Sequence, residues 1–256
     1  MRFQDKLLDS FIAFEQVVDL QNPIHKDRKN ALRRFESKGF PTKKDELWKY
    51  TSLKSITQKD YSLSVKSNPN IGLKDIKKYS INDIDSFKIV FVDGVFNPFL
   101  SNTTHDGMDI CVLSAALTKS KYTKTLKKYF NKIVPDDLSL ASLNTSYTQE
   151  GAYIHIPKSV LPEDPVQILH FSSGKNKPLW LQPRNIIIVE ENARVEIIER
   201  HQSLKAHDGV SNSLTEIYAE KNSFVDYYKI QNDLGTSNLI DNTFIDQKRD
   251  SNVRVH

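Results

Sequence analysis

The sequence contains one cysteine, Cys111, in 256 residues. A single thiol forms no intrachain disulfide and no thiolate-rich metal site, and disulfide-free chains are typical of reducing compartments. The N-terminal residues are polar and lack an apolar signal region, and no apolar stretch approaches the length of a membrane span. We therefore expect a cytoplasmic protein without a membrane partner.

Common catalytic signatures are also missing. The chain has no glycine-rich phosphate-binding loop, so any ATP hydrolysis would have to come from a partner. It has no serine, histidine and aspartate set in a recognisable local context. The excess of 36 Lys+Arg over 32 Asp+Glu, a net charge of +4, is too small to predict nucleic-acid binding. A hydrophobic content of 38% and a charged content of 27% fit an ordinary globular protein with room for more than one domain.

What the sequence does contain is a spaced repeat in its last hundred residues. Val166, Val195, Val225 and Val253 each open a β-rich segment, at spacings of 29, 30 and 28 by subtraction. Such regular spacing is typical of stacked architectures, in which no unit buries its apolar face alone. An antiparallel β-meander is the alternative, but equal spacing with matching residue types favours parallel stacking.

Other positions fall into line when the repeats are aligned on these valines. Each unit reads as a strand, a polar corner and a second strand, with apolar side chains alternating inward. The aligned positions are Ile187, Ile217 and Ile245 before the corner, Asn192, Asn222 and Asp250 in it, and Ile197, Tyr227 and Val255 after it. Residues 153–156 and 165–171 fit less well, and we interpret them as an atypical first rung.

The segments before the repeats predict helices and one hairpin. Helices are expected over 3–18 and 24–37, followed by Thr42 as an N-cap with Asp45 three residues on. Residues 60–86 are expected to be a linker with short elements. A hairpin is expected over 87–96 with its turn at Asp93-Gly94, and helices over 113–132 and 136–147.

The predicted fold class is therefore mainly β with α, a parallel β-helix preceded by helices. We expect an N-terminal helical domain over 1–85, a mixed connector over 86–150, and a β-helix core over 151–256. Because residues 253–256 end in the middle of a rung, we expect this core to be incomplete at its C-terminal end.

The histidines are the first candidates for chemistry. His201 and His207 are expected in a solvated loop, since two side chains are too few for a metal site. His155 is expected on the outer face of the first rung. His170 is aligned with Glu199 and Lys229, which predicts a polar ladder on the outside of the solenoid.

The remaining candidates favour structural roles. Cys111 is expected to be a small buried hydrophobe. The basic stretch 119–132 is expected to form an amphipathic helix rather than a phosphate-binding surface. Trp48 and Tyr50 are expected to anchor packing. The sequence thus predicts no catalytic, cofactor-binding or metal-binding residue.

Six segments, in order, resemble the SufB/SufD family of the SUF iron–sulfur cluster assembly system, and its SufD branch in particular. The segments are 39–51 (GFPTKKDELWKYT), 91–96, 143–145, 151–158, 165–168 and 183–193 (PRNIIIVEENA). The resemblance implies a right-handed parallel β-helix flanked by helical domains at both ends. The family's C-terminal part, where its partner contacts and proposed cluster site lie, is not in this sequence, so no ligand residue is carried over.

The resemblance also implies a function. We expect a non-catalytic scaffold subunit that works with a SufB-like scaffold and a SufC-like ATPase, and indirectly with a cysteine desulfurase system. No cofactor is expected on this chain, and the iron–sulfur cluster belongs to the whole complex. The alternatives are a polysaccharide-active β-helix enzyme and a self-associating solenoid.

Overall fold

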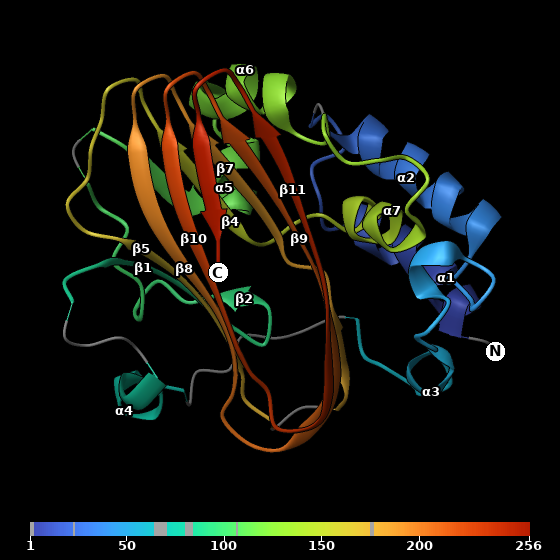
Figure 1. The fold of residues 1–256 in the computed structure, drawn as a ribbon. Helices are drawn as coiled ribbons and strands as arrows, with labels where there is room; N and C mark the ends of the chain where they lie inside the picture. The colour runs from blue at the N-terminus through green and yellow to red at the C-terminus, as the bar shows by residue number, and fades with distance from the viewer. Residues whose placement is uncertain (1–2, 23, 64–70, 80–83, 106, 175–176) are drawn as a thin grey trace.

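Two curved sheets, made mostly of parallel strands from the C-terminal half of the chain, form the body of the protein, and helices lie beside and behind them (Figure 1). The computed structural model describes residues 3–22, 24–63, 71–79, 84–105, 107–174 and 177–256. The strands are β1 Phe87–Val92, β2 Val95–Phe96, β3 Asp109–Val112, β4 Ala152–Ile156, β5 Val166–Ser172, β6 Leu179–Leu181, β7 Arg184–Val189, β8 Arg194–Ser203, β9 His207–Ala219, β10 Phe224–Asn232, β11 Gly235–Gln247 and β12 Asn252–Val255.

The chain passes alternately from one sheet to the other, so successive turns stack as a parallel β-solenoid. One sheet has the order β12-β10-β8-β5-β1-β2, and the other β11-β9-β7-β4-β3, with β6 paired to β9. All pairings among strands β4 to β12 are parallel, and β4 pairs with β3 in the antiparallel sense. The predicted parallel stacking is therefore confirmed, and the meander alternative is wrong.

The register confirms most of the predicted repeat and corrects its beginning. Val225 pairs with both Val195 and Val253, as the spacing predicted. Val166, however, pairs with Ile197 and not with Val195. A shift of two residues keeps every side chain on the same face of a strand. The alternation of apolar residues could therefore not reveal the error.

The corners of the repeat use the left-handed backbone conformation that their residue types tolerate. Asn192, Asn222 and Asp250 have φ angles of 61°, 56° and 60°. The backbone N–H of Asn192 donates to the carbonyl of Lys221 at 3.1 Å, and the N–H of Asn222 donates to that of Arg249 at 3.2 Å. Each corner is thus hydrogen-bonded to the next, and the predicted polar corners are confirmed.

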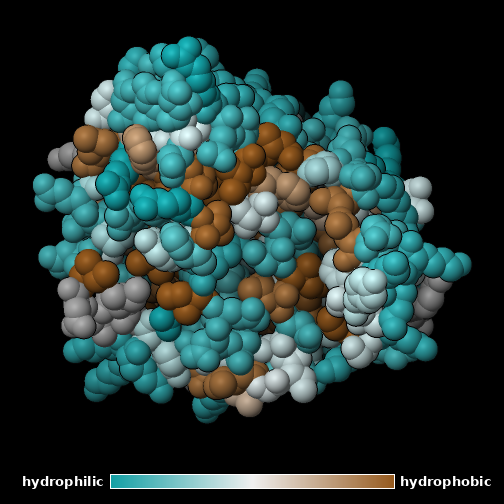
Figure 2. Space-filling model, in the orientation of Figure 1, coloured by the Kyte–Doolittle hydropathy of each residue, from teal (hydrophilic) through white to brown (hydrophobic). Residues whose placement is uncertain are grey.

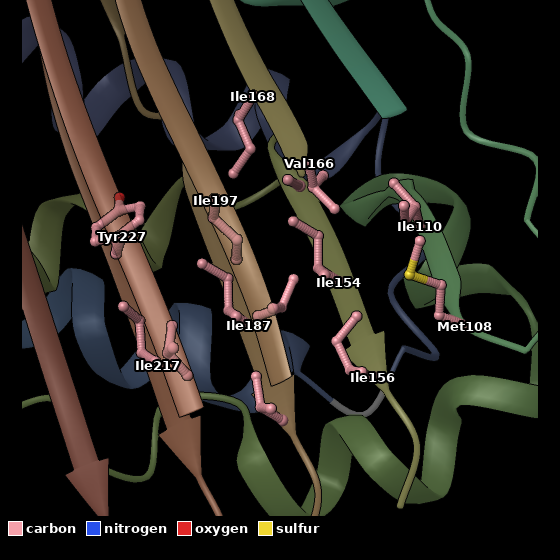
Figure 3. Close-up of a cluster of buried hydrophobic side chains, with 14 of the residues drawn as sticks. Met108, Ile110, Ile154, Ile156, Val166, Ile168, Ile187, Ile197, Ile217 and Tyr227 are labelled. Carbon is pink, nitrogen blue, oxygen red and sulfur yellow. The ribbon is translucent and has the colours of Figure 1, made fainter. Parts of the chain in front are cut away.

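Apolar side chains fill the space between the two sheets near these corners. Figure 3 shows Ile197 and Tyr227 from one sheet facing Ile187 and Ile217 from the other. All four are completely buried. Burial of this kind is the main driving force for stacking, because one turn alone would leave its apolar face in water.

The first strands of both sheets come from the segment predicted as a connector. Strand β1 pairs in parallel with β5, and β3 pairs with β4. The predicted hairpin is confirmed, since β1 and β2 are antiparallel and the turn residues Asp93 and Gly94 have φ angles of 51° and 79°. Positive φ at both positions gives the turn the twist that a two-residue hairpin needs.

Helices α5 and α6 cover the outer face of β4, β7 and β9, and α1, α2 and α7 lie along one side of the solenoid (Figure 1). Helix α4 packs instead against β1 and β5 of the other sheet. The segment predicted as one helix over 113–132 is divided at Lys119, whose backbone is extended. Helix α1 ends at Glu15, earlier than predicted. The helical elements are α1 Phe3–Glu15, α2 His25–Lys38, η1 Glu46–Trp48, α3 Lys54–Thr57, α4 Leu73–Ile76, η2 Lys77–Tyr79, α5 Leu113–Thr118, α6 Ser120–Tyr129 and α7 Ser139–Ser146.

Other N-terminal expectations need correction. The Asp45 carboxylate accepts hydrogen bonds from the N–H and hydroxyl of Thr42, but only a short 3₁₀ turn follows, not an α-helix. Trp48 packs against the hydrophobic cluster that joins the N-terminal helices to the solenoid, whereas Tyr50 is 90% exposed and anchors nothing. The predicted linker over 60–86 lies partly outside the described residues, but its Tyr61 is fully buried and belongs to the core.

The outermost rung of the solenoid exposes several hydrophobic side chains. Figure 2 shows hydrophobic residues gathered around the middle of this face, with hydrophilic residues at the top, where Figure 1 places α6. Exposed residues on β10 to β12 include Phe224, Tyr228, Ile245 and Val255. Among the described residues, no helix is long and apolar enough to cross a membrane.

Asp226 on β10 is a buried acid that lies outside the apolar core. It points away from the solenoid interior, yet it is only 4% exposed. Arg254 Nε lies 2.7 Å from one carboxylate oxygen, and Arg194 Nη2 lies 3.4 Å from the other. The ion pairs of Asp226 thus connect strands β8, β10 and β12.

We expect Asp226→Ala to lower the free energy of unfolding by about 1–2 kcal/mol, because it leaves two arginines without their carboxylate. Urea denaturation of the wild type and the variant measures this. Asp137→Ala, at an exposed loop position, is the control, and we expect it to cost less than about 0.5 kcal/mol. A loss at Asp226 of less than about 0.5 kcal/mol would show that the two arginines add nothing.

Candidate functional site

The interior of the solenoid changes character along its strands. Near the corners it is filled by residues such as Val195 and Ile197, whereas further along β8 the same inward row continues with Glu199 and His201. A cavity of about 300 Å³ adjoins this polar part. Residues of both sheets line it, including Phe91, His170, His201, Trp180, Gln182 and Glu150.

Strand register brings two histidines and one glutamate together beside this cavity. His170 on β5 pairs directly with His201 on β8, and Glu199 precedes His201 by two residues on the same face. The two imidazole rings stack with their centroids 4.6 Å apart and 15° between their planes. Phe91 stacks on the other side of His170, with 5.1 Å between centroids. The three rings thus form a continuous aromatic stack.

The Glu199 carboxylate lies at the centre of this cluster. Its Oε1 is 3.0 Å from His201 Nε2 and 3.4 Å from His170 Nε2. Asn185 Nδ2 donates to the same oxygen at 3.1 Å. Its Oε2 accepts a short hydrogen bond from the Tyr227 hydroxyl, and Lys229 Nζ lies 3.7 Å away. The Glu199 side chain is completely buried, so these groups replace the water that an ionised carboxylate requires.

The protonation states follow from these contacts. Burial opposes charge on Glu199, but Lys229, His170 and His201 more than offset it and hold the pKa of the carboxyl well below its ordinary value. Burial lowers the pKa of His170, and the neighbouring His201 lowers it further. Burial and the charge of Glu199 raise the pKa of Tyr227 well above its ordinary value. At neutral pH the site therefore contains a carboxylate, a neutral His170 and a protonated tyrosine.

The arrangement is able to hold a metal ion. The ligand atoms of His170, Glu199 and His201 all lie within 4.8 Å of one another. Neutral imidazoles and carboxylates are the forms that ligate metals, and borderline ions such as Zn²⁺ and Fe²⁺ accept this combination. Within the described part of the chain no other such group of three occurs.

The sequence prediction of a polar ladder on the outer surface was wrong for these residues. Lys229 does pair with Glu199 in register, but His170 pairs with His201, and Glu199 faces the interior. His201 lies within β8 and is 6% exposed, so it is not in a solvated loop. The alternation of Val195, Ile197, Glu199 and His201 was the signal that could have placed all four inside.

The remaining candidates agree better with expectation. His155 lies on the outside, 2.9 Å from Glu190 and 3.6 Å from Asp109. Burial raises the pKa of the Cys111 thiol to about 11, so it is protonated at neutral pH. The basic segment buries its apolar face, as predicted, through Tyr122, Leu126 and Tyr129.

Two family models match the chain and together cover nearly all of it. Residues 1–168 match the SufBD protein N-terminal region, and residues 170–256 match the SufBD core domain of the SUF system for iron–sulfur cluster assembly. The chain belongs to the SufBD family. The junction of the two SufBD models falls within β5, so His170, Glu199 and His201 all lie in the core-domain match.

Individual SufBD relatives are distant. An iron–sulfur cluster assembly SufBD family protein of Synechocystis is 25% identical over 236 residues, which are 89% of this chain and 52% of that protein. The iron–sulfur cluster assembly protein SufD of Bacillus subtilis is 25% identical over 146 residues, covering 56% and 32%. A SufBD family protein of Staphylococcus aureus is 31% identical over 108 residues, covering 41% and 23%. The chain thus spans about half the length, or less, of these curated relatives.

Glu150, which also lines the cavity, makes stability depend on pH. Burial raises the pKa of its carboxyl to about 7, and the Ser114 hydroxyl, 3.4 Å away, offsets this only in part. An acid whose pKa is raised on folding favours the folded state at low pH. That stability is present below its ordinary pKa of 4.5 and is lost as pH rises to about 7.

We therefore expect Glu150→Gln to change the free energy of unfolding in a way that depends on pH. The variant should gain about 1–3 kcal/mol over the wild type between pH 4.5 and pH 8. Denaturant unfolding at several pH values, compared with the exposed control Glu163→Gln, checks this. If the difference in free energy of unfolding between wild type and Glu150→Gln is the same at pH 4.5 and pH 8, the prediction is wrong.

Proposed function

We propose that this chain is a non-catalytic scaffold subunit of the SufD type in the assembly of iron–sulfur clusters. The observation that carries the proposal is the ordered match of both SufBD models to a chain that folds as a parallel β-solenoid. The motif order seen in the sequence and the named relative in Bacillus subtilis support the SufD type.

The proposed partners are a SufB-like scaffold and a SufC-like ATPase, with a cysteine desulfurase system as the sulfur source. The cluster is then the cargo of the assembled complex in the cytoplasm. A need for an ATPase partner fits a chain whose sequence has no phosphate-binding loop.

The polysaccharide-active alternative finds no support in the carboxylates. An acid and a base for glycoside hydrolysis must both reach a sugar chain at the surface. Glu199 and Glu216 are instead completely buried, and each is held by a basic side chain.

The test is co-purification from cells that express this protein with the SufB-like and SufC-like proteins of the same organism. We expect a tagged copy of this protein to retain both partners. Failure to retain either partner would overturn the proposal.

A further inference from the structure

Two histidines and a glutamate meet at the wall of the interior cavity, and nothing in the packing of the solenoid requires them there. In the preceding turn the position equivalent to Glu199 is the apolar Ile168, and Phe91 on β1 pairs with His170. In the following turn the equivalents of Glu199 and His201 are Lys229 and Gln231. Burying a carboxylate and two imidazoles is costly unless each finds a partner. His170 Nε2 is buried and makes no hydrogen bond among the described residues, although Glu199 Oε1 lies 3.4 Å from it. The cluster thus has a buried ligand nitrogen that lies near its own carboxylate without a well-aligned hydrogen bond to it.

We propose that His170, Glu199 and His201 form a binding site for a divalent transition-metal ion inside the solenoid. The separations between ligand atoms suit such an ion. A tetrahedral ion with bonds of about 2.0–2.1 Å holds its ligand atoms roughly 3.3–3.4 Å apart. The observed separations from Glu199 Oε1 are 3.0 Å to His201 and 3.4 Å to His170.

The surroundings of the cluster support its ligands. Asn185 and Tyr227 donate hydrogen bonds to different oxygens of Glu199, which fixes the orientation of the carboxylate. Such contacts around metal ligands commonly raise affinity by a factor of about 10–100. Binding also requires one of the stacked imidazoles to turn, because an ion lies near the plane of each ring that holds it and the planes of His170 and His201 are nearly parallel.

The cavity determines what kind of site this is. Three protein ligands leave at least one coordination position of a four-coordinate ion for water or another small ligand. Because His170 and His201 line the cavity, that position opens into it. We infer an exchangeable ion of the Zn²⁺, Co²⁺ or Fe²⁺ type; Mg²⁺ and Ca²⁺ prefer oxygen ligands and are not expected to bind.

The positive charge of Lys229 lowers the affinity of the cluster for a cation, so a substitution at this residue tests where the ion binds. Its ammonium lies 3.7 Å from Glu199 Oε2 and also pairs with Asp241. A cation at the cluster is repelled by Lys229 and attracted by Asp241. Replacing the lysine with an apolar residue of similar length therefore favours the metal-bound state.

The first measurement uses the metal-free wild-type protein, titrated anaerobically with Co²⁺ and with Zn²⁺ in competition with a chromophoric chelator. We expect one equivalent of either ion to bind, with Co²⁺ giving the visible absorption of a four-coordinate site. Anomalous diffraction from crystals soaked in Co²⁺ is expected to show the ion between the three side chains. The absence of saturable binding, or an ion located elsewhere, would overturn the proposal.

Variants then assign the ligands. We expect His201→Gln and Glu199→Gln each to weaken Co²⁺ binding by about 100-fold or more, and the matched control His207→Gln on β9 to leave it unchanged. Lys229→Met is expected to tighten binding by about tenfold, which a loss of folding could not produce. Binding that is the same in all four variants would refute the site. The titrations use no partner protein, so their outcome is independent of the proposed scaffold function.

Discussion

Glu216→Gln is expected to lower the free energy of unfolding by about 3–5 kcal/mol, because it leaves the buried guanidinium of Arg184 without its counter-charge. Both side chains are completely buried, and Arg184 Nη2 lies 2.5 Å from Glu216 Oε1. The same guanidinium donates to Asn144 and Thr145 of helix α7. The pair therefore connects the solenoid to the helices that cover it, and its loss weakens that attachment as well.

Denaturant unfolding followed by circular dichroism measures the effect of this change. Glu196→Gln removes the same charge from an ion pair with Arg194 in which both side chains are about half exposed. We expect that control to lose less than about 1 kcal/mol. Equal losses of unfolding free energy in the two variants would show that the buried Arg184–Glu216 pair stabilises the protein no more than an exposed ion pair does.

Val225→Asp is expected to cost about 4–5 kcal/mol, because it places an unpaired carboxylate between the two sheets. Val225 is 1% exposed and lies between Val195 and Val253 in register. The melting temperature and the denaturation midpoint both report the loss.

Val253→Asp is the matched control for this substitution. Val253 occupies the same inward row one rung further along, where it is only partly buried. Its carboxylate retains contact with water, so we expect a cost of about 1–2 kcal/mol. Losses of equal size at the two positions would contradict the stacking order of the rungs.

The sequence was most informative where a local preference and the stacking of turns demanded the same residue. Asparagine and aspartate occupy left-handed corners, and these were recognised directly from Asn192, Asn222 and Asp250. The hairpin at Asp93-Gly94 was recognised for the same reason, since its turn needs positive φ. In both cases the backbone conformation is chosen by the residue itself and by its immediate neighbours.

The site was missed because its formation depends on the register between strands. His170 was aligned with Glu199, two residues from its true partner His201, because the first turn of the repeat is longer than the later ones. Polar residues were also assumed to face water. Glu199 faces the interior because Asn185, Tyr227 and Lys229 compensate its charge there. All three partners come from other strands, and no local pattern predicts such compensation.

Strand β1 joins the solenoid from far away in the chain, and this sets an order of folding events. Asp93, just after β1, accepts a hydrogen bond from Ser173 80 residues later, whereas the corner contact between Asn192 and Asn222 spans 30 residues. Long loops close more slowly than short ones. We expect the later turns to stack rapidly on one another and β1 to dock afterwards. Between these two steps the edge of β5 is open, and the chain is then most exposed to pairing with another molecule.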